Sequence, residues 1–590
     1  MVCTAWLLSA SCGAPPFDPD QLAQGPGGMV GNGQPLTSGI FEGGNDAIPA
    51  ARAVPPPDDT RPPDCDAACA AYCASLPLEN PINRGLCRSL WGVGLAPRPI
   101  DASRACRRMF VDMTGRLPTA EEAASVCTGD WGESARRLMA DERFILVNQR
   151  RAADTFLYNT RTVSISRIYD MDRLVRKLLE GRVPYDLFAS VASAHPIITR
   201  RFADPGDTAE AVFRLFLGRP PFDNERADMG RLYALWQDGY VEHPQLNMRL
   251  PDSFIRFRCL DGNGAVDESR KGECTSVLWG YHELIFTPDI RASRDPEDQQ
   301  LTLWSGLLSP DEWTRLQEPG QVLSREVAFW EKAVSDVVVQ YLGYDLTELV
   351  PEVRLELVRF LLRNQGDIRS VHQAVVTSIA YLQSFEGTTP TRYRWTYGPM
   401  KQMDAEVWLD SLARHSGAAL ASCDHRISDP QAFIQAGSLS AYRVVRNSRW
   451  SFTPEGDIDF SYSDLARNLG GCPENLVGGR FKVPSILTTA TQLNFVNRIC
   501  NVTQDGTVQS APVELLLPPG VAGSDPLSGD LAAQISAHQY QLFYGRAPTP
   551  DEITEAVAAG TECAQAGCSA EAFARPSCFA LLSSAELLFY

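Results

Sequence analysis

The sequence predicts a mainly α-helical protein of repeated helix-turn-helix units, with a less regular, mixed α+β segment near residues 387–525. A short corner pattern occurs three times along the chain, and its apolar positions are spaced as on one face of a helix. Between 387 and 525 this spacing loosens, and glycine, proline and β-forming residues become frequent. The 590 residues, 44% hydrophobic and 21% charged, suffice for several units of about 100 to 200 residues each.

The chain begins with a segment typical of export. Residues 1–12 contain an apolar run (Ala5 to Leu8) followed by Ser9, Ala10, Ser11 and Cys12, which resembles the end of a bacterial lipoprotein signal. Cys12 is the predicted lipidation site, although no Lys or Arg precedes the apolar run and Leu8 lies one position too far from Cys12. Residues 13–64 are rich in Gly and Pro and predict a flexible tether.

Cysteine usage also favours an oxidising compartment. Sixteen cysteines occur without clear metal-ligand spacing, and fourteen remain if Cys3 and Cys12 are set aside. We expect disulfides rather than zinc in a Cys-rich helical cap at 65–103, and no pairing follows from the sequence. The disulfide candidates are Cys65, Cys69, Cys73, Cys87, Cys106, Cys127, Cys259, Cys274, Cys423, Cys472, Cys500, Cys563, Cys568 and Cys578.

The corner pattern predicts where helices end and begin. Each copy has an aromatic residue five positions before a Gly, and a Met or Phe two positions before it, which places both on one buried helix face. The Gly suits a left-handed helix end, and Thr119 with Glu122, like Thr549 with Glu552, has capping-box spacing. The glycines are Gly115, Gly218 and Gly545, and a degenerate fourth copy surrounds Gly343.

An arginine follows the glycine in each full copy. Arg116, Arg219 and Arg546 are therefore candidate ligand-binding residues. The alternative, which we favour, is that each bonds exposed helix carbonyls or a nearby carboxylate. The corners predict helical units 1 and 2 at 104–300, unit 3 at 301–386 and a C-terminal helical unit at 526–590, on either side of the mixed segment at 387–525.

Charge disfavours nucleic acid as a partner. The formal net charge is −18 and the isoelectric point is near 5.0, so the chain would repel a phosphate backbone.

Two sequence motifs suggest a family. RRMFVDMTGRLPT at 107–119 resembles the opening of the planctomycete-type, cytochrome-associated domain of unknown function, and KQMDAEVWLDSL at 401–412 is similar to a motif of its C-terminal companion domain. The ending, with Gly545-Arg546 and SAELLFY at 584–590, also resembles that companion. The resemblance implies an exported helical protein without an established activity. Some relatives carry c-type haem, but no Cys-x-x-Cys-His occurs here, and no cofactor is expected.

Candidate chemistry is sparse. Glu406 and Asp410 lie four residues apart, so they share a helix face where a carboxylate pair could perform acid/base chemistry; an ion pair with arginine is the alternative. Asp261, Asn263 and Asp267 lie at calcium-loop positions, but other ligand positions are wrong and a disulfide-closed loop is the favoured interpretation.

These features lead to a functional expectation. We expect a lipoprotein of the periplasm or cell surface, anchored to the outer membrane through Cys12, that binds or scaffolds a protein or polysaccharide and is not an enzyme. The alternatives are an envelope hydrolase that uses acidic residues and an electron-transfer accessory protein.

Overall fold

The protein is mainly helical, as the corner pattern predicts. The computed structural model describes residues 71, 73–89, 99–156, 165–199, 202, 204–237, 240–243, 248–251, 318–384, 398–416, 426–427, 444–445, 468–471, 486–501 and 511–590. Strands within these ranges form two short antiparallel pairs, β1 (Tyr240–His243) with β2 (Met248–Pro251) and β3 (Arg426–Ile427) with β4 (Val444–Val445).

The first large group of helices precedes residue 384. It comprises α3 (Pro81–Ser89), α4 (Ala102–Thr114), α5 (Ala120–Val126), α6 (Trp131–Met139), α7 (Glu142–Thr155), α8 (Ile165–Leu179), α9 (Tyr185–Ala194), α10 (Pro196–Thr199), α11 (Pro205–Leu217), α12 (Asp223–Gln237), α17 (Val327–Leu342), α18 (Leu346–Leu349), α19 (Pro351–Arg363) and α20 (Ile368–Val376). One hydrophobic core runs through it, from Ile82 to Tyr381.

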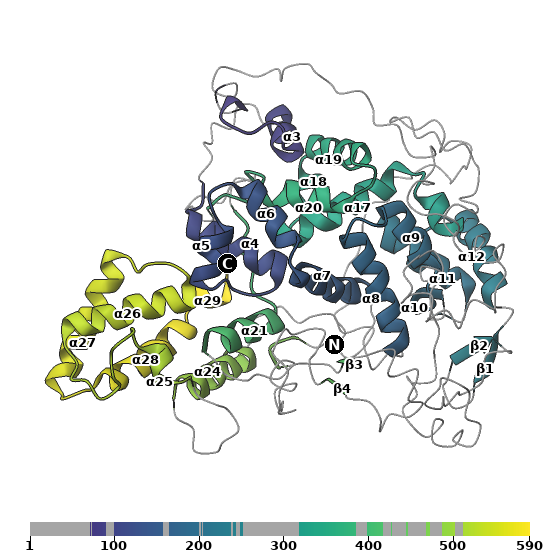
Figure 1. Cartoon of the computed structure of the whole chain (residues 1–590). Helices are drawn as coiled ribbons and strands as arrows, with labels where there is room; N and C mark the ends of the chain where they lie inside the picture. Colours follow the sequence, from purple (N-terminus) through teal and green to yellow (C-terminus); the bar gives the residue numbers. More distant parts are fainter. Residues whose placement is uncertain are drawn as a thin grey trace, which may run out of the picture.

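The second group follows residue 400. It comprises α21 (Ala405–Ser416), α24 (Ile486–Cys500), α25 (Val513–Leu516), α26 (Gly529–Tyr544), α27 (Pro550–Gln565), α28 (Ala570–Leu582) and α29 (Ala585–Leu588). These helices share a second core, which also takes in Val111 and Leu117 from α4 and the turn after it. In Figure 1 the end of the chain returns from the yellow C-terminal helices to the purple α4. Helix α4 therefore belongs to both cores.

The predicted corners form where the pattern places them. Helices α4, α11 and α26 end at Gly115, Gly218 and Gly545, whose φ angles are 69°, 72° and 67°. A residue with a Cβ is strained in this left-handed conformation, so glycine is the residue that lets the chain turn there. Gly343 ends α17 in the same conformation, with φ 73°.

Capping boxes start the helices after the first and third corners. The Thr119 hydroxyl accepts from the Glu122 N–H, while the Glu122 carboxylate accepts from the Thr119 N–H, and Thr549 with Glu552 repeats the arrangement. The second corner has Phe222 at the matching position, so only the carboxylate half exists there, from the Phe222 N–H to Glu225 at 2.7 Å.

Eight of the predicted disulfide cysteines pair among the described residues. The bonds are Cys73–Cys87, Cys106–Cys127, Cys563–Cys568 and Cys500–Cys578. The last pair joins α24 to α28 across 78 residues. Cys65, Cys69, Cys259, Cys274, Cys423 and Cys472 lie outside the described residues.

The predicted unit boundaries stay a prediction. The described residues of 104–300 and 301–386 share the first core, and the described part of 387–525 holds three helices as well as β3 and β4. Within the described ranges, no helix combines the length and the apolar character that a membrane span needs.

Candidate functional site

The three corner arginines form ion pairs within their own corners. Each guanidinium binds, through both of its terminal nitrogens, the glutamate that lies six residues later. The pairs are Arg116–Glu122, Arg219–Glu225 and Arg546–Glu552, with N–O distances from 2.5 to 2.9 Å. The same glutamates accept the backbone N–H that begins the next helix, so one carboxylate closes the turn and caps the helix.

Two of these arginines also reach a second carboxylate. Arg219 lies 3.5 Å from Glu326, and Arg546 lies 2.7 Å from Glu586 in α29. Hydrogen bonds to the corner glutamates are the largest cause that raises the pKa of both arginines above the ordinary value, and the second carboxylates act in the same direction. The structure therefore places these guanidinium groups in contacts that join helices of this chain.

The candidate acid pair lies on α21, as its spacing predicts. Glu406 is buried, with 1% of its surface exposed, whereas the side chain of Asp410 lies outside the described residues. On the same segment, Asp404 binds buried Arg150 of α7 at 3.0 Å. The pairing of Glu406 with Asp410 stays a prediction.

Other candidates also lie outside the described residues: the lipidation site Cys12, the tether, and the calcium-loop residues Asp261, Asn263 and Asp267. Within the described ranges, no group of three or more His, Cys, Asp or Glu is placed to hold a metal ion.

A buried polar centre joins the two helical groups. Asp112 of α4 is completely buried, and its carboxylate accepts hydrogen bonds from the Tyr381 and Tyr590 hydroxyls, each at 2.8 Å, and from the ammonium of Lys401. We call these four residues the Asp112 centre. Its members are far apart in sequence: the nearest two are 20 residues apart, and the most distant two are 478 apart. It is therefore a product of the tertiary structure.

Burial dominates the electrostatics of this centre. It lowers the pKa of Lys401 to about 8, although the Asp112 carboxylate acts in the opposite direction. Burial, with the Asp112 charge as the next cause, raises the pKa of Tyr381 and Tyr590 well above the ordinary value. At neutral pH Lys401 is therefore still mostly an ammonium, and both phenols are neutral.

Beside the Asp112 centre lies a second buried hydrogen bond. The Tyr341 hydroxyl and Nδ1 of His372 are 2.7 Å apart, and the Tyr341 ring meets the Tyr381 ring edge to face. Burial lowers the pKa of His372 to about 3, so its imidazole is neutral in the folded protein.

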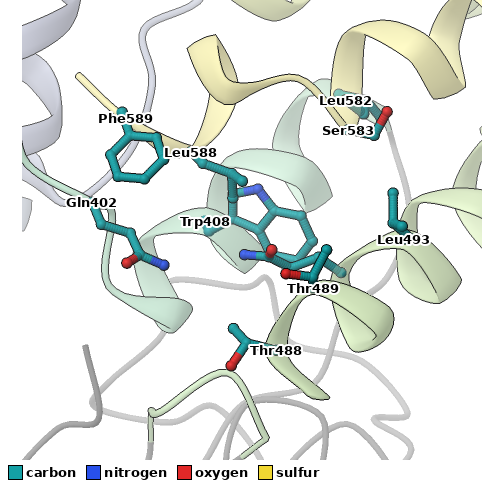
Figure 2. A pocket seen from close by; sticks show the side chains of 10 residues that line it. Gln402, Trp408, Thr488, Thr489, Leu493, Leu582, Ser583, Leu588 and Phe589 are labelled. Atoms are coloured by element: carbon teal, nitrogen blue, oxygen red, sulfur yellow. The ribbon is translucent and has the colours of Figure 1, made fainter. Parts of the chain in front are cut away.

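A pocket opens next to the Asp112 centre, between α21, α24 and the end of the chain (Figure 2). Its volume is about 180 Å³. Uncharged polar side chains and apolar side chains line it in equal numbers: Gln402, Thr488, Thr489, Gln492 and Ser583, and Trp408, Leu493, Leu582, Leu588 and Phe589. None of these lining residues is charged.

Trp408 lies at the middle of this wall. Trp408 is 2% exposed, and its indole packs against Phe495, with ring centroids 5.7 Å apart. In the part of the chain that the structure describes, no acceptor lies within hydrogen-bond reach of its Nε1. A buried donor without a partner is costly, so Nε1 is a polar group that this wall leaves unsatisfied.

Neither the Asp112 centre nor the pocket is among the sites predicted from the sequence. One signal was present, because Asp112 lies in the motif at 107–119, Lys401 and Trp408 lie in the motif at 401–412, and Tyr590 lies in the ending. These are the segments that carry the family resemblance. The remaining pocket residues have no such signal.

Comparison with known proteins adds no relative: no family model, no curated protein and no solved structure matches the chain.

Proposed function

We propose that this chain is an exported, lipid-anchored protein of the bacterial cell envelope that binds a neutral polysaccharide through the pocket at Trp408. The observation that carries the proposal is the lining of the pocket, which combines amide and hydroxyl groups with apolar surfaces and has no charge. A sugar ring offers the matching chemistry, because its hydroxyls donate and accept hydrogen bonds while its C–H faces are apolar.

The size of the pocket supports recognition of one unit of a longer chain. Sites for drug-sized ligands usually measure about 300–1,000 Å³, and this pocket is smaller, at about 180 Å³. A polymer would insert one residue and lie along the surface on either side. The formal charge of −18 favours a neutral polymer over an anionic one.

Export and anchoring are supported by the disulfides and by the leader. The four disulfides among the described residues suit an oxidising compartment. Cys12, followed by the Gly/Pro-rich tether, suits a lipid anchor at the outer membrane.

The binding experiment uses the full chain and a panel of neutral and anionic oligosaccharides in isothermal titration calorimetry. We expect a neutral oligosaccharide to bind, and Gln492→Ala and Thr489→Val each to weaken binding about three- to tenfold, the usual effect of one lost hydrogen bond. Gln541→Ala is the matched control, since Gln541 is an exposed glutamine of α26 outside the pocket. Equal affinities of Gln492→Ala and the control would exclude the pocket as the oligosaccharide-binding site.

The anchor is tested in bacterial cells. We expect the wild-type protein to sediment with outer membranes and to incorporate a labelled fatty acid. Cys12→Ala removes the thiol that would carry the lipid, so it should release the protein into the soluble fraction without label. A Cys3→Ala variant controls for loss of a cysteine as such, and label retained by Cys12→Ala would contradict lipidation at this residue.

A further inference from the structure

A short antiparallel pairing of two segments forms the junction between the pocket and the Asp112 centre. Gln402 and Phe589 form an antiparallel bridge, and Lys401 and Tyr590 exchange backbone hydrogen bonds of 3.1 Å in both directions. The Met403 N–H extends the pairing to the Leu588 carbonyl at 2.8 Å. We call the paired residues 401–403 and 588–590 the terminal bridge.

The terminal bridge presents different residues on its two sides, because successive side chains of a strand point in opposite directions. Gln402 and Phe589 lie side by side in the wall of the pocket, as Figure 2 shows. Their neighbours Lys401 and Tyr590 both bind Asp112, and the Lys401 ammonium also lies over the Tyr590 ring, 4.9 Å from its centroid. One short element therefore carries both a pocket wall and a buried anchor.

The anchor is supplied by the first helical group. Asp112 lies on α4, between two residues that also form hydrogen bonds. The Thr114 hydroxyl donates to the Phe110 carbonyl. The Arg108 guanidinium donates to the carbonyls of Tyr381 and Gln383. A strand pair as short as the terminal bridge has few hydrogen bonds of its own, and a pair of strands alone is marginally stable in water. Its position therefore depends on what its side chains bind.

We propose, on the basis of the binding function above, that Asp112 is a positioning residue for the pocket: it holds Lys401 and Tyr590 so that Gln402 and Phe589 form the ligand-binding wall. If the carboxylate were lost, Lys401 would be a buried ammonium without a counter-charge. Its flexible side chain would turn towards water, and the backbone of the terminal bridge would loosen with it. The Asp112 centre thus links the wall of the pocket to α4 of the first helical group.

The test measures hydrogen exchange and oligosaccharide affinity of the full chain in parallel. Lys401→Met removes the ammonium and should speed exchange of the Lys401 and Met403 backbone amides at least tenfold, and weaken oligosaccharide binding at least fivefold. Lys401→Arg retains a cation and should keep both values near those of the wild type. Tyr590→Phe removes a single hydroxyl and should give smaller changes in the same direction.

Tyr233→Phe is the matched control. The Tyr233 hydroxyl is buried and bonds the Ser193 carbonyl within the first helical group, remote in sequence from the terminal bridge. This variant should change neither amide exchange at 401 and 403 nor affinity.

Two results would overturn the positioning role. The first is wild-type exchange at 401 and 403 in both Lys401→Met and Tyr590→Phe. The second is faster exchange in these variants with unchanged affinity, which would show that the pocket does not depend on the terminal bridge. A wild-type chain that binds no oligosaccharide would contradict the proposed function instead, and the exchange rates would still decide whether the Asp112 centre holds the terminal bridge.

Discussion

The corners and the Asp112 centre both pair a cation with a carboxylate, but they do so over different distances along the chain and, for the first and third corners, at different depths. The corner pairs link residues six apart, and their glutamates range from 0% to 26% exposed in the side chain. The Asp112 centre is buried and joins Asp112 to Lys401, 289 residues later, and to Tyr590. A corner can therefore form with its own helices, whereas the centre requires both helical groups to be folded and docked.

This difference predicts unequal costs of mutation. An exposed ion pair contributes little to stability, because water solvates its members when the pair is broken. A broken buried pair leaves one charge in a site from which water is excluded. Substitutions in the Asp112 centre should therefore cost more stability than substitutions in a corner.

The largest effect is expected for Asp112→Ala. The substitution leaves Lys401 without its counter-charge and two buried tyrosine hydroxyls without their acceptor, so we expect a loss of about 3 kcal/mol or more in the free energy of unfolding. The urea dependence of circular dichroism measures this loss. The double variant Asp112→Ala with Lys401→Met should be less destabilised than the sum of the single variants, and strict additivity would contradict the coupling.

The second prediction concerns acid. The folded protein keeps His372 neutral down to about pH 3, because burial lowers its pKa from 6.5 to about 3. The unfolded chain takes up a proton below pH 6.5, so the stability from this residue is complete above pH 6.5 and is lost as the pH falls towards 3. At pH 5 the loss is about 2 kcal/mol. His372→Gln should flatten the profile of unfolding free energy between pH 7 and 5, and an unchanged profile would contradict the assignment.

The third prediction concerns a corner. Arg546→Ala removes the contacts to Glu552 and Glu586, and we expect a loss of about 1 kcal/mol because these carboxylates are partly solvated. Arg546→Lys should recover little of it, since an ammonium does not form the two parallel bonds. Arg214→Ala, which breaks the exposed pair with Glu210, serves as the control and should lower the free energy of unfolding by only a few tenths of a kcal/mol. A cost for Arg546→Ala as large as that of Asp112→Ala would erase the contrast.

Acid should also distinguish the corner from the His372 site. Hydrogen bonds from Arg546 lower the pKa of Glu552 from 4.5 to about 2. The stability from this lowered pKa is present above pH 4.5 and is lost as the pH falls towards 2. The corner is therefore expected to weaken at a lower pH than the His372 site. Amide exchange at the start of α27, followed between pH 6 and 3, measures the order of the two losses.

The smallest effect is expected for Thr549→Gly. Glycine is itself acceptable at a helix N-cap, so the change should cost only a few tenths of a kcal/mol, whereas Thr549→Ala should cost about 1 kcal/mol. Thermal unfolding of both variants measures the difference. Equal losses would show that the hydroxyl of Thr549 does not cap α27.

Local features were predictable from the sequence to a large extent. The positions of Gly115, Gly218 and Gly545, and both capping boxes, follow from residues within six positions of one another. The arginine–glutamate spacing is also present in all three copies, but the sequence predicts only helix carbonyls or a nearby carboxylate as the partner and does not select the glutamate. A six-residue spacing across a turn does not show whether two side chains are in contact, because the contact depends on the shape of the turn.

Long-range features were not predictable. Nothing in the sequence distance of Cys500 from Cys578 distinguishes that pair from other pairings. The pocket was not predictable either, because its lining residues come from α21, α24 and the end of the chain, which are far apart in sequence.

Sequence alone was enough to predict that this protein is mainly helical, where its corners turn, and that fourteen of its cysteines are disulfide candidates, because these predictions use backbone preferences, short-range spacing and composition. Only the tertiary structure decided that α4 serves two cores, that Asp112 gathers Tyr381, Lys401 and Tyr590, and that an uncharged pocket forms beside them. The physical reason is that burial creates these features: a carboxylate becomes an anchor, and a set of amides and hydroxyls becomes a pocket, only where distant segments exclude water together.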